Sequence, residues 1–373
     1  MKYYIIAGEA SGDLHGSNLI RELKLLDKEA QFRFWGGDLM EKQGGTLVKH
    51  YKHHAFMGIF EVLLNLRTIS LNFKLCHKDL ANYKPDILIL IDYSGFNLRI
   101  AKFAKQIGLT IYYYISPQVW AWRQSRVKTI KKLIDRMFVV LPFVKDFYKN
   151  HNYNVDFVGH PLLDAIEQYA PEKLSIKEFS KINNLSSKLV IAILPGSRKQ
   201  EISKKLPIML SLIHHYPDYQ FVIAAAPSQE KEFYDKFIKD YNVHVLYSKT
   251  YSILQQSVAA IVTSGTATLE TALFGVPQVV CYKAGTISYH IAKRLVKIKY
   301  ISIVNLVMDK QVVKELIQDD LTSENIKTEL DRILFDESYR NNMIENYKKL
   351  ENKLGGKGAS KRTAKLIYNA RKV

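Results

Sequence analysis

The segment from Ala259 to Lys283 combines residue types and spacing that could bind an anion. An apolar stretch, Ala259 to Val262, is followed by small hydroxylated residues and then by apolar residues at helical spacing. This pattern predicts a strand, a tight turn and a helix. Gly265 lets the backbone approach a ligand closely, and the first N–H groups of the helix lie at the positive end of its dipole. A capped helix behind a buried strand, without any ligand, is the alternative.

Side chains near this turn indicate what kind of anion it could hold. Ser264 and Thr266 offer hydroxyl groups, whereas the Glu270 carboxylate suits the two hydroxyls of a ribose better than a phosphate. A second turn, Leu194 to Arg198, also follows a predicted strand and ends in an arginine, which can bind phosphate through two hydrogen bonds. We therefore expect the phosphates of a nucleotide ligand in the C-terminal half of the chain.

A third turn follows the first predicted strand and carries acidic residues. Its glycines, Gly8, Gly12 and Gly16, do not have the G-x-G-x-x-G spacing of dinucleotide-binding turns. Glu9 and Asp13 would also repel a pyrophosphate. This turn therefore suits sugar hydroxyls or general-base chemistry better than a nucleotide.

Both halves of the chain alternate short apolar stretches with segments of helical periodicity, which predicts two doubly wound α/β domains. The run from Ile87 to Ile91 is continuously apolar, as is typical of a strand buried in a parallel sheet. The polar stretch from Pro161 to Ser187 has weak periodicity and predicts a linker. The sequence thus indicates an N-terminal domain over residues 1–165, a second domain over residues 188–340 and basic C-terminal helices over residues 341–373.

Composition restricts the class of protein. The chain has 373 residues, 47% hydrophobic and 24% charged, as expected for a globular protein with two domains. Its net charge of +18 suggests an anionic membrane surface or phosphorylated substrates, and we expect no nucleic acid partner because no nucleic-acid-binding signature occurs. The two cysteines are far apart and lack neighbouring metal ligands, so we expect no metal. No stretch approaches the ~20 apolar residues that span a bilayer.

These features resemble the GT-B architecture, in which two Rossmann-like domains face each other across a cleft and a C-terminal helix returns to the first domain. Within that class, the chain is similar to the lipid-A-disaccharide synthase family, glycosyltransferase family 19. The matching motifs run in order through nearly the whole chain: AGEASGD (7–13), MGIFEVL (57–63), SPQVWAWR (116–123), LPF (141–143), FVGHPL (157–162), LPGSR (194–198), SGTATLE (264–270) and AKRLVKIKYISIVNLV (292–307).

The resemblance implies an inverting glycosyltransferase of lipid A biosynthesis. It would join UDP-2,3-diacylglucosamine to 2,3-diacylglucosamine 1-phosphate and release a β-1,6-linked disaccharide 1-phosphate and UDP. No cofactor is implied, since the UDP-sugar is a substrate. The donor site would lie in the C-terminal domain, with Glu270 at the ribose, Asn305 near the diphosphate and Arg198 offsetting the charge on the leaving UDP. The other implied donor-site residues are Gly196, Ser197, Ser264, Gly265, Thr266 and Ala267.

The acceptor side departs from the family pattern. Members commonly carry a motif close to I-D-A-P-D-F-N, whose second aspartate is assigned the removal of the proton from the acceptor 6-hydroxyl. Here residues 91–97 read IDYSGFN, and Gly95 stands in place of that aspartate. Asp92, Glu9 and Asp13 remain as candidate general bases. We favour Asp92, which closes a buried strand, although it could instead cap the following helix.

The resemblance also implies a location and partners. Acylated substrates suggest a cytoplasmic protein bound peripherally to the inner face of the bacterial inner membrane. The apolar stretch from Met57 to Cys76 could enter an anionic membrane surface or could be core. Relatives can exchange their C-terminal segment in dimers, so a homodimer is an expectation. The alternative functions are another GT-B enzyme, such as a UDP-N-acetylglucosamine 2-epimerase, and a non-catalytic protein that binds anionic lipid.

Overall fold

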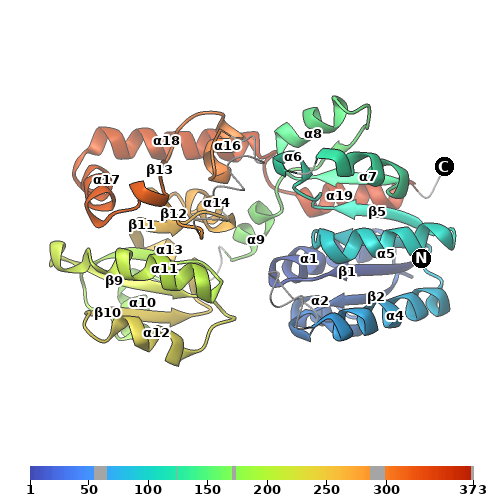
Figure 1. Ribbon diagram of the computed structural model, residues 1–373, viewed down its shortest axis with the longest axis horizontal. Helices are drawn as coiled ribbons and strands as arrows, with labels where there is room; N and C mark the ends of the chain where they lie inside the picture. The colour runs from blue at the N-terminus through green and yellow to red at the C-terminus, as the bar shows by residue number, and fades with distance from the viewer. Residues whose placement is uncertain (54–64, 123, 170–173, 286–298, 371–373) are drawn as a thin grey trace. The chain divides into compact units, whose positions relative to one another are not determined.

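The chain forms two compact units, shown in a computed structural model that describes residues 1–53, 65–122, 124–169, 174–285 and 299–370 (Figure 1). The first unit comprises Met1–Ala165 together with Leu354–Val373, and the second comprises Ile166–Lys353. Each unit is built on one parallel β-sheet with connecting helices. The α/β class predicted from the alternation of apolar stretches is therefore confirmed.

The sheet of the first unit has seven strands in the order β3-β2-β1-β4-β5-β6-β7. Its central strand β4 is a continuous apolar run, and so is β1 after its exposed first residue, Lys2; a strand with both faces buried needs such a run. Their side chains are buried almost throughout. The strands are β1 Lys2–Ala7, β2 Gln31–Gly36, β3 Thr46–His50, β4 Ile87–Ile91, β5 Thr110–Tyr114, β6 Arg136–Val139 and β7 Asp156–Phe157.

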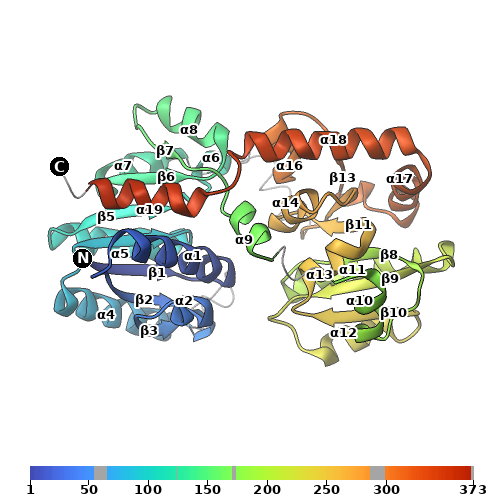
Figure 2. The ribbon, with the colours of Figure 1, turned by 180° about the vertical axis from the view of Figure 1, so that it is seen from behind.

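Helices cover both faces of this sheet. Helices α1 and α19 pack together on one face, and α4, α5 and α7 form the layer on the other (Figures 1 and 2). The α-helices are α1 Ala10–Leu26, α2 Asp38–Lys42, α4 Leu66–Tyr83, α5 Ser94–Gln106, α6 Val119–Trp122, α7 Val127–Leu133, α8 Pro142–Lys149, α9 Leu162–Tyr169 and α19 Ala359–Asn369. The short 3₁₀ turns are η1 Tyr51–His53 and η2 Gln124–Arg126.

The second unit repeats the plan with six strands in the order β10-β9-β8-β11-β12-β13. These strands are β8 Leu189–Leu194, β9 Tyr219–Ala225, β10 Val243–Tyr247, β11 Ser257–Thr263, β12 Gln278–Tyr282 and β13 Lys314–Ile317. The helices are α10 Ile176–Asn183, α11 Lys199–Leu210, α12 Lys231–Ile238, α13 Thr250–Gln256, α14 Thr266–Leu273, α16 Ile303–Met308, α17 Ser323–Phe335 and α18 Glu337–Lys353, with 3₁₀ turns η4 Ile213–His215 and η5 Gln318–Asp320. Packed apolar side chains of β8, β9, β11 and α13 form one core cluster.

The order of the strands reverses once in each sheet. In the first sheet the reversal lies between β1 and β4, where Ala7 is opposite Ile91. In the second sheet it lies between β8 and β11, where Leu194 is opposite Val262. Loops leave such a point in opposite directions at the carboxyl ends of the strands, which opens a place for ligands. The structure thus marks one candidate position in each unit.

The chain returns to the first unit at Leu354, whereas the predicted C-terminal segment, expected to return to the first domain, begins at residue 341. Helix α18 packs against α14, α16 and α17 and so belongs to the second unit. Of the last two helices, only α19 packs on α1 (Figure 2). The Asp164 carboxylate holds the beginning of α19, because Oδ1 accepts from the N–H of Gly358 at 2.6 Å and Oδ2 from the N–H of Ser360 at 2.8 Å. Of the segment 341–373, the first thirteen residues therefore pack with the second unit.

Candidate active site

Two turns at the carboxyl edge of the second sheet lie beside each other. One follows β8 and contains Gly196, and the other begins where β11 ends at Thr263. Gly196 has a φ of +108°, and a Cβ atom there would come within 3.3 Å of the Thr263 side chain. Glycine suits this position because it tolerates both the backbone angle and the close approach. The two turns predicted to bind phosphate therefore form one site, the donor turns.

Helix α14 begins at the donor turns with an exposed N-terminus. Gly265 precedes the helix at φ +146°, a Cβ atom on it would meet none of the described residues within 4 Å, and Thr266 is exposed. The Thr268 hydroxyl donates to the Gly265 carbonyl at 2.8 Å and fixes the turn. The N–H groups of Thr266 and Ala267 belong to the first helical turn, which has no acceptor within the helix. They offer an anion two donors at the positive end of the helix dipole.

Ser264 connects the donor turns to the neighbouring strand and loop. Its N–H donates to the Cys281 carbonyl at 3.1 Å, and its hydroxyl donates to the Ile301 carbonyl at 3.0 Å. The Ser264 hydroxyl proton is therefore used within the protein, and its oxygen can still accept. Ser264 therefore orients the turn, and its contact with a ligand stays a prediction.

Arg198 and Ser197 lie on the turn after β8. The Arg198 side chain is 62% exposed, and its Nη1 lies 3.3 Å from Glu201 Oε1. The Ser197 carbonyl accepts from Gln229 Nε2 at 2.9 Å, which holds the turn in place. An exposed ion pair contributes little to stability, so the Arg198 guanidinium can leave Glu201 for a phosphate at small cost.

Glu270 lies one turn into α14 and is half-buried. Burial raises the pKa of its carboxyl group, while a hydrogen bond from the Tyr251 hydroxyl, 3.4 Å from Oε1, acts in the opposite direction. A carboxylate held in this way can accept hydrogen bonds from sugar hydroxyls. The contact with a ribose stays a prediction.

Asn305 is fully buried, and the protein uses both ends of its side-chain amide. Its Oδ1 accepts from the N–H groups of Val312 and Val313, at 2.7 and 3.0 Å. Its Nδ2 donates to the Val313 carbonyl and to Glu315 Oε1, each at 2.9 Å. Glu315 in turn binds the backbone of the loop that accepts from Ser264. Asn305 therefore supports the donor turns, and a direct contact with the diphosphate, which stays a prediction, would require one of these bonds to break.

In the first unit, the turns that follow β1 and β4 also lie side by side. A Cβ atom on Gly8 would come within 2.2 Å of the Tyr93 ring, so Gly8 leaves room for that ring. Burial, together with the charge of Glu9, raises the pKa of Tyr93 to about 12. Glu9 is half-buried and precedes α1 directly. These two acidic turns are called the acceptor turns below.

Asp92 combines an unusual backbone conformation with a partly buried carboxyl group. Its φ of +43° and the φ of +45° of Tyr93 lie in the left-handed region, which residues other than glycine adopt at a cost. Its carbonyl accepts from the Asn97 amide at 2.8 Å and from the Tyr113 hydroxyl. Burial raises the pKa of its carboxyl to about 6, partly offset by a hydrogen bond from the Tyr93 backbone. The alternative that Asp92 caps α5 is wrong, since Tyr93 occupies the cap position without a side-chain cap bond.

Asp13, by contrast, is built into the fold. It is buried, and its Oδ1 accepts from the N–H groups of Gly37 and Met40, at 2.8 and 3.0 Å. Its Oδ2 accepts from the N–H of Leu39 at 3.0 Å. These donors belong to the N-terminus of α2, where unpaired N–H groups need acceptors. This arrangement gives Asp13 a structural role and makes it the least accessible of the three candidate bases.

Gly95 lies exposed in the first turn of α5. A Cβ atom at this position would have no neighbour within 4 Å among the described residues. The described residues therefore leave space for an acidic side chain at this position, which in this chain is a glycine.

Sequence reasoning missed three side chains near these turns: Tyr93, Tyr251 and Lys205. Tyr93 follows Asp92 directly, and its place over Gly8 depends on β1 and β4 being neighbours. Tyr251 reaches Glu270 from another helix. Lys205 has a weak signal in the sequence, because it lies at the spacing of the apolar residues Ile202, Leu206 and Met209 on α11.

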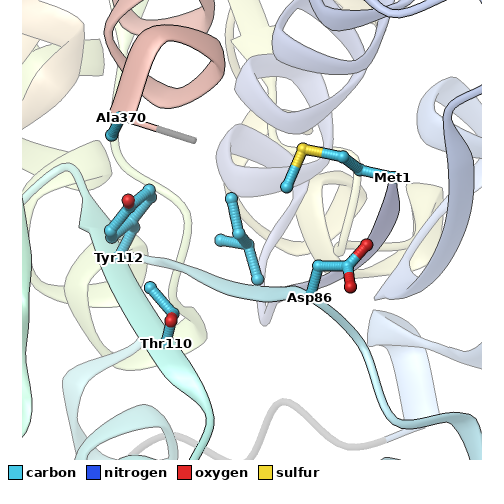
Figure 3. A pocket seen from close by; sticks show the side chains of 6 residues that line it. Met1, Asp86, Thr110, Tyr112 and Ala370 are labelled. Atoms are coloured by element: carbon cyan, nitrogen blue, oxygen red, sulfur yellow. The ribbon is translucent and has the colours of Figure 1, made fainter. Parts of the chain in front are cut away.

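A hollow elsewhere in the first unit is lined by Met1, Asp86, Ile87, Thr110, Tyr112 and Ala370 (Figure 3). It lies at the amino ends of β1, β4 and β5, opposite to the acceptor turns. Its charged groups already have partners, since the Met1 amine pairs with Asp27 at 3.0 Å and Asp86 accepts from the N–H of Lys2 at 2.8 Å. We therefore do not assign this hollow to the candidate active site.

Within the described part of the chain, no group of three or more His, Cys, Asp or Glu side chains could hold a metal ion. Across these same ranges, no helix has the length and apolar character needed to cross a membrane.

Comparison with known proteins identifies the family. The family model described as lipid-A-disaccharide synthetase matches residues 3–368. The lipid-A-disaccharide synthase of Geobacter sulfurreducens is 39% identical over 97% of this chain and 95% of its own length. That of Trichlorobacter lovleyi is 38% identical over 98% and 96%.

Solved structures with this fold are more distant in sequence. UDP-GlcNAc 2-epimerase from Neisseria meningitidis, bound to UDP-GlcNAc, superimposes with a TM-score of 0.70 over 99% of this chain and 100% of its own. Its sequence identity is only 15%, so this likeness shows the shared GT-B-type fold of two Rossmann-like domains and does not favour an epimerase. The family match over nearly the whole chain decides between the two enzymes. The chain belongs to the lipid-A-disaccharide synthase family of glycosyltransferases.

Proposed function

We propose that this chain transfers 2,3-diacylglucosamine from UDP to the 6-hydroxyl of 2,3-diacylglucosamine 1-phosphate. The observation that carries the proposal is the pair of donor turns, which meet at Gly196 and Thr263 beside the strand reversal of the second sheet; one turn carries Arg198 and the other opens the N-terminus of α14. Such a site fits a diphosphate, and the family membership supplies the sugar. The other product is UDP.

In the proposed reaction, the acceptor oxygen forms a bond to the anomeric carbon while the bond from that carbon to the UDP oxygen breaks. The Asp92 carboxylate takes the proton of the acceptor hydroxyl, and the leaving UDP keeps the electron pair of the broken bond. Arg198 and the N-terminus of α14 then offset the charge that develops on the diphosphate. A carboxyl group whose burial raises its pKa to about 6 suits this work, because it is ionised at neutral pH and still basic.

The same proposal places the protein on an anionic membrane surface, where its acylated substrates reside. Helix α4 exposes Leu66, Leu71 and Leu75, at 56%, 56% and 42%, beside the basic residues Lys74 and Lys78. Apolar side chains next to lysines are typical of helices that lie in a membrane interface. The first part of the predicted apolar stretch, residues 57–64, lies outside the described residues. Binding to phosphatidylglycerol vesicles that weakens when Leu71 and Leu75 become serine tests this placement.

A homodimer that exchanges its C-terminal segment also stays a proposal. In the structure, α19 packs on α1 of its own chain, and Asp164 holds its first turn. The same contacts would form between two chains if the segment crossed at Gly355 and Gly356. Light scattering at several protein concentrations distinguishes a monomer from a dimer.

One assay tests the proposed reaction as a whole. The protein is incubated with UDP-2,3-diacylglucosamine and 2,3-diacylglucosamine 1-phosphate in mixed micelles, and the disaccharide and UDP are both quantified. We expect them to form in equal amounts. Release of UDP without disaccharide, or conversion of free UDP-GlcNAc to its 2-epimer, would contradict the proposal.

A further inference from the structure

Lys205 is a buried charged residue that the proposed reaction does not use. It lies in the middle of α11 and is only 2% exposed, among the apolar residues by which α11 packs on the sheet. Burial lowers the pKa of its ammonium group. A buried ammonium without a partner is costly, so its presence here needs an explanation.

The neighbouring groups do not neutralise Lys205. Glu201 is the carboxylate that acts on its charge, but Glu201 Oε1 lies 3.3 Å from Arg198 Nη1, and no carboxylate of the described residues comes within 4.0 Å of the lysine. Cys281 also lies near, but burial raises the pKa of its thiol to about 12, so it is neutral at physiological pH. Within the described ranges, the Lys205 ammonium has no hydrogen-bond partner.

The position of Lys205 connects it to the donor turns. Cys281 lies near the end of β12, and its carbonyl accepts from the N–H of Ser264, the residue just before Gly265. Arg198, which also acts on the charge of Lys205, stands on the turn after β8. Glu201, one helical turn before Lys205, comes within 3.2 Å of where a Cβ of Gly196 would lie. Lys205 is therefore close enough to Arg198, on the donor turns, for the charge of that side chain to act on it.

We propose that Lys205 is a second cation of the donor site, held beneath the turns, which attracts the diphosphate of the bound nucleotide through the protein. This inference rests on the proposed function, because it takes the donor turns to be the UDP site. Lys205 does not touch the ligand, so it is a positioning residue. The ligand would be the counter-charge that the free protein lacks, and the low polarity around the ammonium strengthens the attraction.

The test compares Lys205→Met with Lys204→Met. Methionine has a similar length and no charge, so it fills the same buried space, and replacement of buried charges by apolar residues is often neutral or stabilising. Lys204 is exposed on the same helix, so its substitution removes an equal net charge from the surface. Calorimetry measures the affinity of each protein for UDP, and a titration followed by NMR measures its affinity for uridine, which has no phosphate.

We expect Lys205→Met to weaken UDP binding about tenfold or more, because a cation and a diphosphate still attract each other substantially at an effective dielectric constant of about 20. Uridine binding should stay within twofold, and Lys204→Met should change neither affinity by more than twofold. The melting temperature of Lys205→Met should equal or exceed that of the parent chain.

Three outcomes would overturn the inference. If Lys205→Met binds UDP as tightly as Lys204→Met does, the buried charge does not act on the diphosphate. If uridine and UDP affinities fall together, Lys205 has only a structural role. If the parent chain does not bind UDP at all, the donor-site proposal fails, and the inference fails with it.

Discussion

The donor turns and the acceptor turns occupy equivalent places in their sheets but carry opposite charge. Both follow the two strands at which the strand order reverses, β8 and β11 in one unit and β1 and β4 in the other. The donor turns combine Arg198 with the open N-terminus of α14, whereas the acceptor turns combine Glu9 with Asp92. The same architecture can therefore hold a diphosphate or position a base, and the side chains on the turns decide which.

The two pairs of turns also differ in how their acids are used. At the donor turns, Glu201 holds Arg198 in a weak exposed pair that a phosphate can replace. At the acceptor turns, Asp13 is tied to α2, while Asp92 is half-buried with a raised pKa. The comparison teaches that the type of a residue in a turn is a poor guide to its role until its hydrogen-bond partners are known.

The largest effect should come from Asp92→Asn. Asparagine keeps the shape of the side chain but cannot accept the proton, and removal of a general base typically costs 10²- to 10⁴-fold in rate. The disaccharide assay measures kcat, and calorimetry should show that UDP still binds. Near-normal transfer would assign the role of base to Glu9 and would contradict the proposed difference between Asp92 and Asp13.

Arg198→Ala should have the next largest effect, on the donor side. The loss of one donor that stabilises developing charge costs about 2–4 kcal/mol of transition-state stabilisation. The ratio kcat/KM for the UDP-sugar measures this loss. A turnover within twofold of the parent chain would show that the α14 N-terminus offsets the charge by itself.

Asp13→Ala should lower the stability of the fold and should have no direct effect on the transfer step. The substitution leaves three N–H groups at the start of α2 without their acceptor, and the loss of such a cap typically costs about 0.5–2 kcal/mol. Urea denaturation gives the change in the free energy of unfolding. If stability stays unchanged while transfer is abolished, Asp13 acts in the reaction and the structural assignment is wrong.

The pH dependence of transfer sharpens the role of Asp92. Since burial raises the pKa of its carboxyl from 3.8 to about 6, kcat should fall as the pH drops through about 6, where the base becomes protonated. Between these two values the folded state binds the proton more tightly than the unfolded chain, so Asp92 makes stability decrease as the pH rises through this window. Asp92→Asn should remove this contribution. An acid limb of the rate near pH 4 would contradict the assignment.

The smallest effect should come from Gly95→Asp, which introduces the acid that the resemblance to the family led us to expect at this position. Among the described residues, a Cβ atom at this exposed position has no neighbour within 4 Å, so the melting temperature should change by less than a few degrees. If the new carboxylate takes over as base, the double variant with Asp92→Asn recovers part of the lost transfer. An inactive double variant would show that Asp92 alone can serve in this chain.

Much of this protein could be predicted from its sequence, because local patterns carry the information. Continuous apolar runs such as Ile87–Ile91 predicted buried parallel strands, and the hydroxyl-rich turn before α14 predicted an anion site at a helix N-terminus. The motifs that match the family fixed the activity. These features depend on residues close together in the chain, so they can be read without knowledge of the fold.

The tertiary structure decided what depends on contacts between distant residues. Strand order placed β1 beside β4 and β8 beside β11, which brought each pair of turns together. The sequence favoured Asp92 among three candidate bases because it closes a buried strand, but only the hydrogen-bond partners showed that Asp13 holds α2. Burial is likewise a property of packing: the charge of Lys205 looks ordinary in the sequence and becomes unusual only because α11 packs with this residue buried among apolar ones.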